Sequence, residues 1–237
     1  MSALRQVVLD TETTGLDPRQ GHRVIEIGAV ELVSRRPTGN SYHVYLNPER
    51  EIDAGATQVH GMTWDDLRDK PRFADVAAGF LEFLGGAELL IHNAPFDCGF
   101  LDQELGLLGL TALSEHCAGI RDTLRLAKEL HPGKRNSLDA LCERYAIDNS
   151  RRSLHGALLD AQLLAEIYLA MTRGQESLLM DLAPAAVVGT EPGTRERLPL
   201  KLLAANAAEE QAHVQYIAAL QLESGGRCLW LADTALS

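Results

Sequence analysis

Residues 7–15 read VVLDTETTG, a short apolar run that leads into two carboxylates and a glycine. The apolar run predicts a buried strand, because β-branched and aliphatic side chains suit a covered sheet. Side chains two residues apart project from the same face of a strand, so Asp10 and Glu12 are expected to point at one spot. Two neighbouring carboxylates repel by ~1 kcal/mol in water and ~4 kcal/mol at an effective dielectric of 20. The pair therefore favours a shared divalent cation, and the alternative is that one carboxylate caps a turn while the other is solvated.

A second cluster, residues 92–97 (HNAPFD), lies where an expected strand at 88–92 (ELLIH) joins the helix that follows it. Pro95 suits the first turn of a helix that we expect to extend to residue 108. Asp97 then falls in that first turn, where the helix dipole stabilises an anion. Alone, this cluster is also consistent with a simple capping carboxylate.

The third cluster contains His155 and Asp160, which are five residues apart. That spacing places them on different helix faces, so they share a site only if His155 lies in the loop before a helix at 156–171. Histidine can take a proton from water near neutral pH, which makes His155 a candidate general base. The alternative is an exposed loop histidine beside a solvated aspartate.

The rest of the chain divides into a mixed α/β region and a separate C-terminal part. Apolar stretches at 24–33 and 42–46 extend the first strand into a β-meander, and helical spacing follows. The expected helices are 73–84, 95–108, 122–130, 137–145, 156–171 and a final amphipathic one at 202–222. Recurring prolines and glycines between 173 and 200 predict a linker. The predicted domains are therefore 1–172, 173–200 and 201–237.

Composition limits the ways in which this chain could meet its partners. Its 237 residues carry 22 basic and 33 acidic side chains, a net charge of −11, so any contact with nucleic acid must be local. No apolar run approaches the ~18 residues of a membrane span, and no signal peptide precedes the first acidic residue, so we expect a cytoplasmic protein. The four cysteines form no CxxC pair, which favours reduced thiols.

The order of the motifs resembles the DEDDh family of 3′-5′ exonucleases. That family uses an acidic DxE pair, a second aspartate and a final His-x4-Asp, and the matching residues here are Asp10, Glu12, Asp97, His155 and Asp160. The segments 58–62 (QVHGM) and 132–141 (PGKRNSLDAL) extend the resemblance over residues 1–172. It implies an α/β, RNase H-like fold, in which helices flank a mixed five-stranded sheet and a linker and C-terminal helix follow.

The resemblance also implies the chemistry, which is phosphodiester hydrolysis with two divalent ions, Mg²⁺ or Mn²⁺. By analogy, Asp10 would bridge both ions, while Glu12 and Asp160 would hold the ion that carries the attacking water. Asp97 would support the second ion through water, and His155 would deprotonate the nucleophile. The products would be 5′-mononucleotides.

Further residues are implied in contacts with the terminal nucleotide, namely Thr13, Leu16, His60 and Phe96 in addition to Asp160. For Leu16 and Phe96, core packing is an open alternative. The basic doublets Lys134-Arg135 and Arg151-Arg152 are expected mainly as solvated surface, and contacts with backbone phosphates are the alternative.

The C-terminal part is expected to bind proteins. Residues 175–180 (QESLLM) resemble a peptide that docks on the bacterial sliding clamp (beta), with Gln175, Leu178 and Met180 as anchors; the alternative is a helix end and linker. By the same resemblance, residues 201–233 would bind a polymerase catalytic (alpha) subunit through Trp230 and Leu231. A small accessory subunit is left open. Such tethering raises the local concentration to ~mM and compensates weak affinity for DNA.

These features predict an enzyme that removes mispaired nucleotides from a single-stranded or frayed 3′ end of DNA, as the proofreading partner of a replicative polymerase. Two alternatives stay open. The catalytic residues do not distinguish DNA from RNA, so the same chemistry would also serve for trimming RNA 3′ ends. A scaffold that bridges clamp and polymerase is the second alternative, although the complete carboxylate set argues against a purely structural role.

Overall fold

The computed structural model describes residues 4–150, 152, 154–173, 205–226, 228 and 230. The chain divides into two units, Met1–Pro184 and Ala185–Ser237, each of which is described by itself. Within the described ranges, no helix combines the length and apolar character needed to cross a bilayer.

The first unit is built on one mixed sheet. Its strands are β1 (Arg5–Thr13), β2 (Val24–Val33), β3 (Arg36–Tyr45), β4 (Glu88–Ile91) and β5 (Gly119–Asp122), in the order β3-β2-β1-β4-β5. The β1, β2 and β3 strands form an antiparallel meander, whereas β4 runs parallel to both β1 and β5. This five-stranded mixed sheet confirms the predicted fold class.

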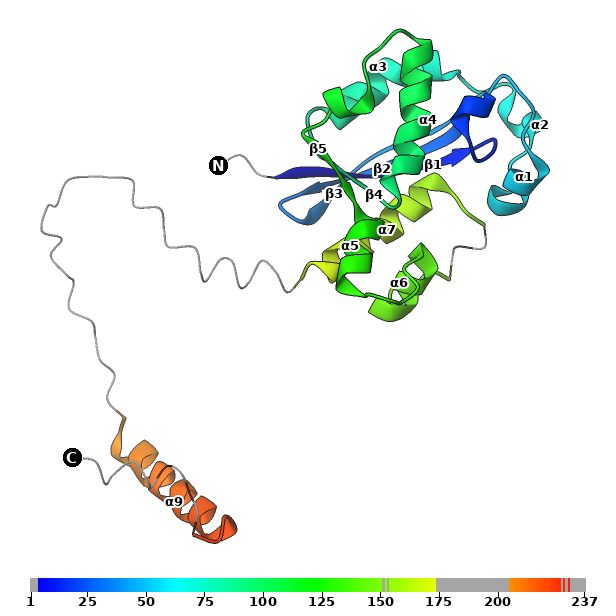
Figure 1. Ribbon diagram of the computed structural model, residues 1–237. Helices are drawn as coiled ribbons and strands as arrows, with labels where there is room; N and C mark the ends of the chain where they lie inside the picture. The colour runs from blue at the N-terminus through cyan, green and yellow to red at the C-terminus, as the bar shows by residue number, and fades with distance from the viewer. Residues whose placement is uncertain are drawn as a thin grey trace, which may run out of the picture. The chain divides into compact units, whose positions relative to one another are not determined.

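Helices cover both faces of the sheet (Figure 1). One face carries α3 (Phe73–Leu84) and α4 (Ala94–Leu107). The other carries α5 (Thr123–Leu130) and α7 (Ala157–Met171), and α6 (Leu138–Tyr145) packs against α7. Alternate β1 side chains serve the two cores: Leu9 is buried with Phe100 of α4, whereas Val8 is buried with Leu164 of α7. The central strand thus has a fixed α4 side and a fixed α7 side.

Strand β2 and helix α7 approach each other unusually closely at Gly28. A Cβ atom added to Gly28 would lie 2.1 Å from the backbone nitrogen of Leu158, at the start of α7. Only a residue without a side chain permits this approach. Because Gly28 pairs with Asp10 across the β1–β2 ladder, the contact brings the beginning of α7 next to the acidic end of β1.

Several elements differ from the sequence-based expectations. Strand β5 has only one aliphatic residue, Ile120, and was not predicted from the pattern. No element was expected where the short helices α1 (Ala54–His60) and α2 (Trp64–Leu67) and the 3-10 turn η2 (Leu113–Glu115) lie. The 3-10 turn η1 (Pro18–Gln20) lies in a stretch whose glycines and proline indicate turns. Strand β1 continues through the acidic pair to Thr13, as the expected shared direction of Asp10 and Glu12 requires.

The described part of the second unit contains helix α9 (Ala207–Glu223). Asn206 caps it, since its side-chain oxygen accepts hydrogen bonds from the backbone nitrogens of Ala208 and Glu209. We expected this helix at 202–222, of which residues 202–204 lie outside the described ranges. The linker expected at 173–200 also lies outside them, apart from residue 173.

Candidate active site

The acidic end of β1 faces helix α7. Asp10 and Glu12 alternate with Thr11 along the strand, so both carboxylates leave it on the α7 side, the side of Val8. Glu12 is buried, with 8% of its surface exposed. Its cross-strand partner on β2 is Glu26, another buried carboxylate, whose Oε1 lies 2.7 Å from Nε2 of His43.

Asp97 reaches the same end of the sheet from the first turn of α4. Its Oδ1 accepts two hydrogen bonds from Thr11, one from the backbone nitrogen at 3.0 Å and one from Oγ1 at 2.7 Å. Burial raises the pKa of Asp97 to about 7, although these two bonds act in the opposite direction. Asp97 is thereby fixed in place relative to β1.

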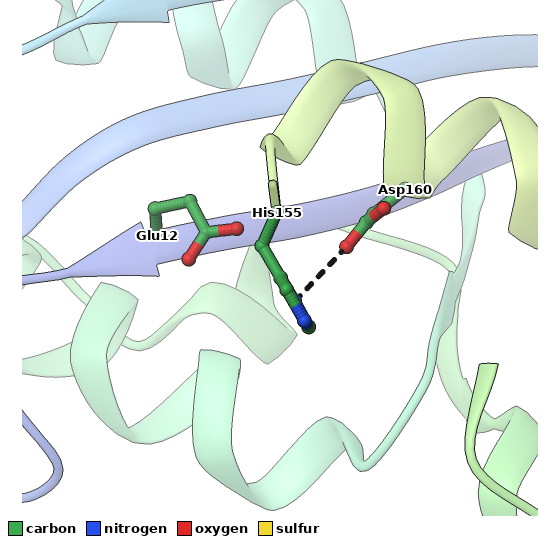
Figure 2. Close-up of side chains that lie close together, drawn as sticks. All are labelled: Glu12, His155 and Asp160. Atoms are coloured by element: carbon green, nitrogen blue, oxygen red, sulfur yellow. Dashed lines mark ion pairs between the residues drawn. The ribbon is translucent and has the colours of Figure 1, made fainter. Parts of the chain in front are cut away.

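His155 and Asp160 come from the start of α7. His155 lies in the loop just before the helix, as their spacing requires, and its backbone nitrogen donates to the carbonyl oxygen of Val59 at 3.1 Å. Asp160 is buried in the first turn, with its Oδ2 3.5 Å from Nδ1 of His155. Figure 2 shows His155 between Glu12 and Asp160, with its ring joined to the Asp160 carboxylate, and ligand atoms of all three lie within 4.8 Å of one another.

The cluster of carboxylates is electrostatically unfavourable without a cation or protons. Burial, followed by the charges of Asp97, Glu12 and Asp160, raises the pKa of Asp10 well above its usual range. Burial and then the charge of Asp160 raise the pKa of Glu12 to about 8. Buried oxygens that repel one another in this way suit a hard divalent ion. The residues present therefore fit the metal that the sequence predicts.

Arg152 was expected to be solvated or to contact a phosphate, and the expectation of a solvated side chain is wrong. Only 6% of the side chain is exposed, and it pairs with both Asp160 and Asp139. Burial by itself lowers the pKa of Arg152, but its hydrogen bonds and its attraction to Asp160 and Asp139 raise that pKa above the ordinary value. Sequence reasoning missed this contact because it depends on the path of the loop before α7.

These groups line a cleft of about 580 Å³, which also includes His92, Asn93, Lys134 and Asn136. His92 is held by Oγ1 of Thr123 at 3.1 Å and by the carbonyl oxygen of Asn136 at 2.9 Å, so both of its ring nitrogens are satisfied. We interpret His92 as a structural residue that ties β4 to the segment before α6.

An apolar pocket of about 430 Å³ adjoins the cleft, and Glu12 and Phe96 line both. Of the residues expected to contact a nucleotide, Asp160 lines the cleft, and the others line this pocket: Thr13, Leu16, His60 and Phe96. Leu16 is 85% exposed, so it does not pack in the core, whereas Phe96 is partly buried with its ring centroid 5.0 Å from that of Phe100. The pocket thus offers apolar and aromatic surface beside the carboxylates.

His60 brings a hydrogen-bond donor to the apolar pocket. Its Nδ1 accepts from the backbone nitrogen of Met62 at 3.1 Å, and burial lowers the pKa of the ring, which favours the neutral form. The backbone of Thr13 opposes this fall in pKa, and the proton then resides on Nε2, a buried atom without a well-formed hydrogen bond among the described residues. A donor left in this position is suited to a ligand.

The predicted protein-binding residues are only partly described. Gln175, Leu178, Met180 and Leu231 lie outside the described ranges. Trp230 lies within them and is 74% exposed. In the second unit it lines a pocket of about 630 Å³ with side chains of α9, among them Val214, Ile217 and Leu222.

Comparisons with known proteins agree with the geometry. The family model described as Exonuclease (RNase_T) matches residues 7–168. The DNA polymerase III subunit epsilon of Pasteurella multocida is 51% identical over 235 residues, which cover 95% of this chain and 93% of that protein. The protein of the same name from Escherichia coli K12 is 49% identical over 239 residues, or 96% and 98% of the two chains.

Solved structures share the fold. Exonuclease X in complex with 5′ overhanging duplex DNA is 25% identical and superposes with a TM-score of 0.57, covering 72% of this chain and 92% of that one. Escherichia coli exonuclease I in complex with a dT13 oligonucleotide gives a TM-score of 0.64 at 19% identity, covering 75% and 43% of the two chains. The second likeness bears on the fold alone.

Proposed function

This chain belongs to the exonuclease family, among the epsilon subunits of DNA polymerase III, and from that premise we infer that it is a proofreading 3′-5′ exonuclease that removes mispaired nucleotides from DNA. The observation that carries the inference is the convergence of four carboxylates and a histidine at one end of the sheet. These are Asp10, Glu12, Asp97, His155 and Asp160. Enzymes of this family depend on a divalent metal.

The four carboxylates would hold two divalent ions, either Mg²⁺ or Mn²⁺. When bound, such ions supply Lewis acidity and neutralise the charge that develops on the phosphate. The raised pKa values of Asp10, Glu12 and Asp97 support this role, since each carboxylate gains from a nearby cation. The bound ions would thereby let a chain with a net negative charge bind the phosphates of DNA at one local site.

His155 is the proposed general base. It takes a proton from a water molecule as the water oxygen attacks the phosphorus of the terminal phosphodiester. The bond from that phosphorus to the 3′ oxygen of the preceding nucleotide breaks, the 3′ oxygen gains a proton, and a 5′-mononucleotide leaves. The side chain of His155 is 45% exposed in the cleft, so water and bulk solvent can exchange protons with it.

The apolar pocket is the proposed binding site for the terminal nucleotide. Leu16 and Phe96 offer surface for the base, and Nε2 of the neutral His60 donates a hydrogen bond to the sugar or to the phosphate. Because the pocket and the cleft share Glu12 and Phe96, a nucleotide held in the pocket places its phosphate beside the carboxylates. Thr13 lines the pocket next to Glu12.

The C-terminal residues are the proposed means of attachment to the polymerase. The exposed Trp230 beside α9 has the size and exposure of an interface anchor for the catalytic (alpha) subunit, with Leu231 next to it in the chain. The segment 175–180, with Gln175, Leu178 and Met180, is proposed to dock on the sliding clamp (beta), and whether a small accessory subunit also binds is open. Attachment keeps the active site near the primer end despite the net charge of −11.

The proposal is tested on a 5′-labelled primer with a mismatched 3′ end, as DNA and as the RNA equivalent, with Mg²⁺ or EDTA. Wild type should shorten the DNA stepwise only with Mg²⁺, and Asp160→Asn should abolish shortening. Asp65→Asn removes an exposed carboxylate on α2 and serves as the matched control. Preference for RNA would indicate a trimming enzyme, and no hydrolysis of either strand would indicate a scaffold.

A further inference from the structure

Arg152 makes the contacts of a bound cation inside the active site. Its Nε donates to Oδ1 of Asp160 at 2.6 Å and its Nη2 donates to Oδ2 at 2.7 Å, so both oxygens of one buried carboxylate are engaged. The same Nη2 lies 2.8 Å from Nδ1 of His155. One guanidinium therefore contacts both the carboxylate of Asp160 and the ring of His155, the proposed base.

The atoms that Arg152 engages are those that a metal ion would need. Asp160 and His155 are two members of the group whose ligand atoms lie within 4.8 Å of one another, and Glu12 is the third. A bidentate guanidinium uses both oxygens of a carboxylate in fixed geometry and repels a divalent ion that approaches the same edge. Arg152 and a metal ion therefore cannot both bind the carboxylate of Asp160 favourably at the same time.

On the basis of the metal-binding role proposed above, we propose that Arg152 is an internal counter-ion that competes with the divalent metal for Asp160. Metal binding releases the guanidinium from Asp160 and from the ring nitrogens of His155. When the metal leaves, the guanidinium returns and neutralises the buried carboxylate. The ring nitrogens of His155 are therefore free of the contact with Arg152 only when metal is bound.

Asp139 supplies the position to which Arg152 is released. Nη1 of Arg152 donates to Oδ1 of Asp139 at 2.6 Å, and the side chain of Asp139 is 60% exposed in the first turn of α6. Arg152 bridges an inner and an outer carboxylate, so it can leave Asp160 and still keep a charged partner. The buried guanidinium does not have to be solvated completely during the exchange.

The alternative is a permanent structural ion pair that stays intact when metal binds. In that case Arg152 affects metal affinity only through its charge, as any nearby cation does. Lys134 lines the same cleft, so Lys134→Gln removes one positive charge from the neighbourhood without touching the bidentate contact. The comparison of the two residues separates displacement from general electrostatics.

The test is the dissociation constant for Mn²⁺, measured on the full-length chain without DNA by the loss of the free-ion electron paramagnetic resonance signal. Competition predicts that Arg152→Gln lowers the Kd at least about tenfold, since a bidentate charged contact no longer has to be broken. Lys134→Gln should lower it only about twofold, because salt screens a separated charge. The Kd of Arg152→Lys should lie between those of wild type and Arg152→Gln, since lysine keeps the charge but cannot make the bidentate contact.

Equal shifts for Arg152→Gln and Lys134→Gln, or weaker Mn²⁺ binding by Arg152→Gln, would overturn the proposal. Thermal unfolding gives a second readout: Arg152→Gln should have a lower Tm than wild type in EDTA, and Mn²⁺ should raise its Tm by more. If wild type bound no Mn²⁺ at all, the metal-binding role of the carboxylates would itself be contradicted. If wild type binds Mn²⁺ but Arg152→Gln leaves the Kd unchanged, the proposed competition for Asp160 is wrong while the metal-binding role stands.

Discussion

Thr11 donates two hydrogen bonds to a single carboxylate oxygen of Asp97, at 3.0 Å from its backbone nitrogen and at 2.7 Å from its hydroxyl. Both bonds favour the ionised carboxylate and oppose the burial that raises the pKa of Asp97 to about 7. Thr11→Val removes the hydroxyl bond with little change of shape, so the pKa of Asp97 rises further. We expect the acidic limb of the pH profile of kcat/KM to move to higher pH.

The matched control is Thr38→Val. The hydroxyl of Thr38 donates to Oε2 of Glu31 at 2.8 Å, so the same chemical change is made at another carboxylate outside the cleft. Its pH profile should coincide with that of wild type. Should Thr11→Val also coincide with wild type, the ionisation of Asp97 would not limit the reaction.

Stability should fall with rising pH when metal is removed. Burial raises the pKa of Glu12 from 4.5 to about 8, so the folded chain holds a proton that the unfolded chain has lost. Such a group stabilises the fold fully below its unfolded pKa, and that contribution is lost as pH rises through the folded pKa. Asp10 shifts in the same direction. In EDTA, the Tm should therefore decrease between about pH 5 and pH 9.

Glu12→Gln tests the origin of that decrease. The amide cannot ionise, so at about pH 9 in EDTA the variant should have a higher Tm than wild type, and a flatter dependence on pH. Saturating Mg²⁺ should stabilise wild type more than the variant, because it binds the carboxylate. Glu82→Gln, at an exposed position of α3, should reproduce the wild-type curve. Parallel curves for Glu12→Gln and wild type would exclude Glu12 as the titrating group.

His155→Ala should reduce kcat by about 10² to 10⁴, the usual contribution of a general base. Glu12 and Asp160 are unchanged in this variant, so Mn²⁺ should still raise its Tm. The two readouts distinguish a base from a ligand, because His155 also lies within the possible metal-binding group. Loss of the Mn²⁺ effect would make His155 a ligand, and wild-type rates would rule out both roles.

Trp230→Ala should weaken binding to the polymerase catalytic subunit while hydrolysis of free single strands is unchanged. An aromatic anchor contributes about 2 kcal/mol or more to an interface, which corresponds to about a 30-fold rise in Kd. Tyr216 is 65% exposed on α9 but does not line the pocket around Trp230, so Tyr216→Ala is the control. Surface plasmon resonance with immobilised polymerase subunit would show equal Kd values if Trp230 were no anchor.

The sequence predicts those parts of the fold that depend on a repeated pattern. The apolar run of β1 and the helical spacing of α3 and α7 reflect burial along one face, and each is visible in the order of residues. Strand β5 was missed because it is held by backbone pairing with β4 and has a single aliphatic side chain. Local composition does not encode such a pairing.

In the candidate site, too, the sequence revealed the residues that follow a recognisable pattern and missed those that meet only in the assembled fold. The spacing within β1 fixed the shared direction of Asp10 and Glu12, and the resemblance to one family joined them with Asp97, His155 and Asp160. Contacts that join distant segments were not found: Thr11 and Asp97 are 86 residues apart, and Arg152 reaches Asp160 by the path of an irregular loop. These contacts follow from the assembled fold and have no periodic signal.

The absence of a side chain at Gly28 sets the alignment of the two halves of the active site. One added methyl group would act as a wedge between β2 and the start of α7, at 2.1 Å from the nitrogen of Leu158. Helix α7 carries Asp160, with His155 just before it, so the wedge would displace them from Asp10 and Glu12. A displacement of about 1 Å can slow a reaction about 10²-fold. A glycine outside the carboxylate cluster thus sets how precisely the catalytic groups of α7 are aligned with those of β1.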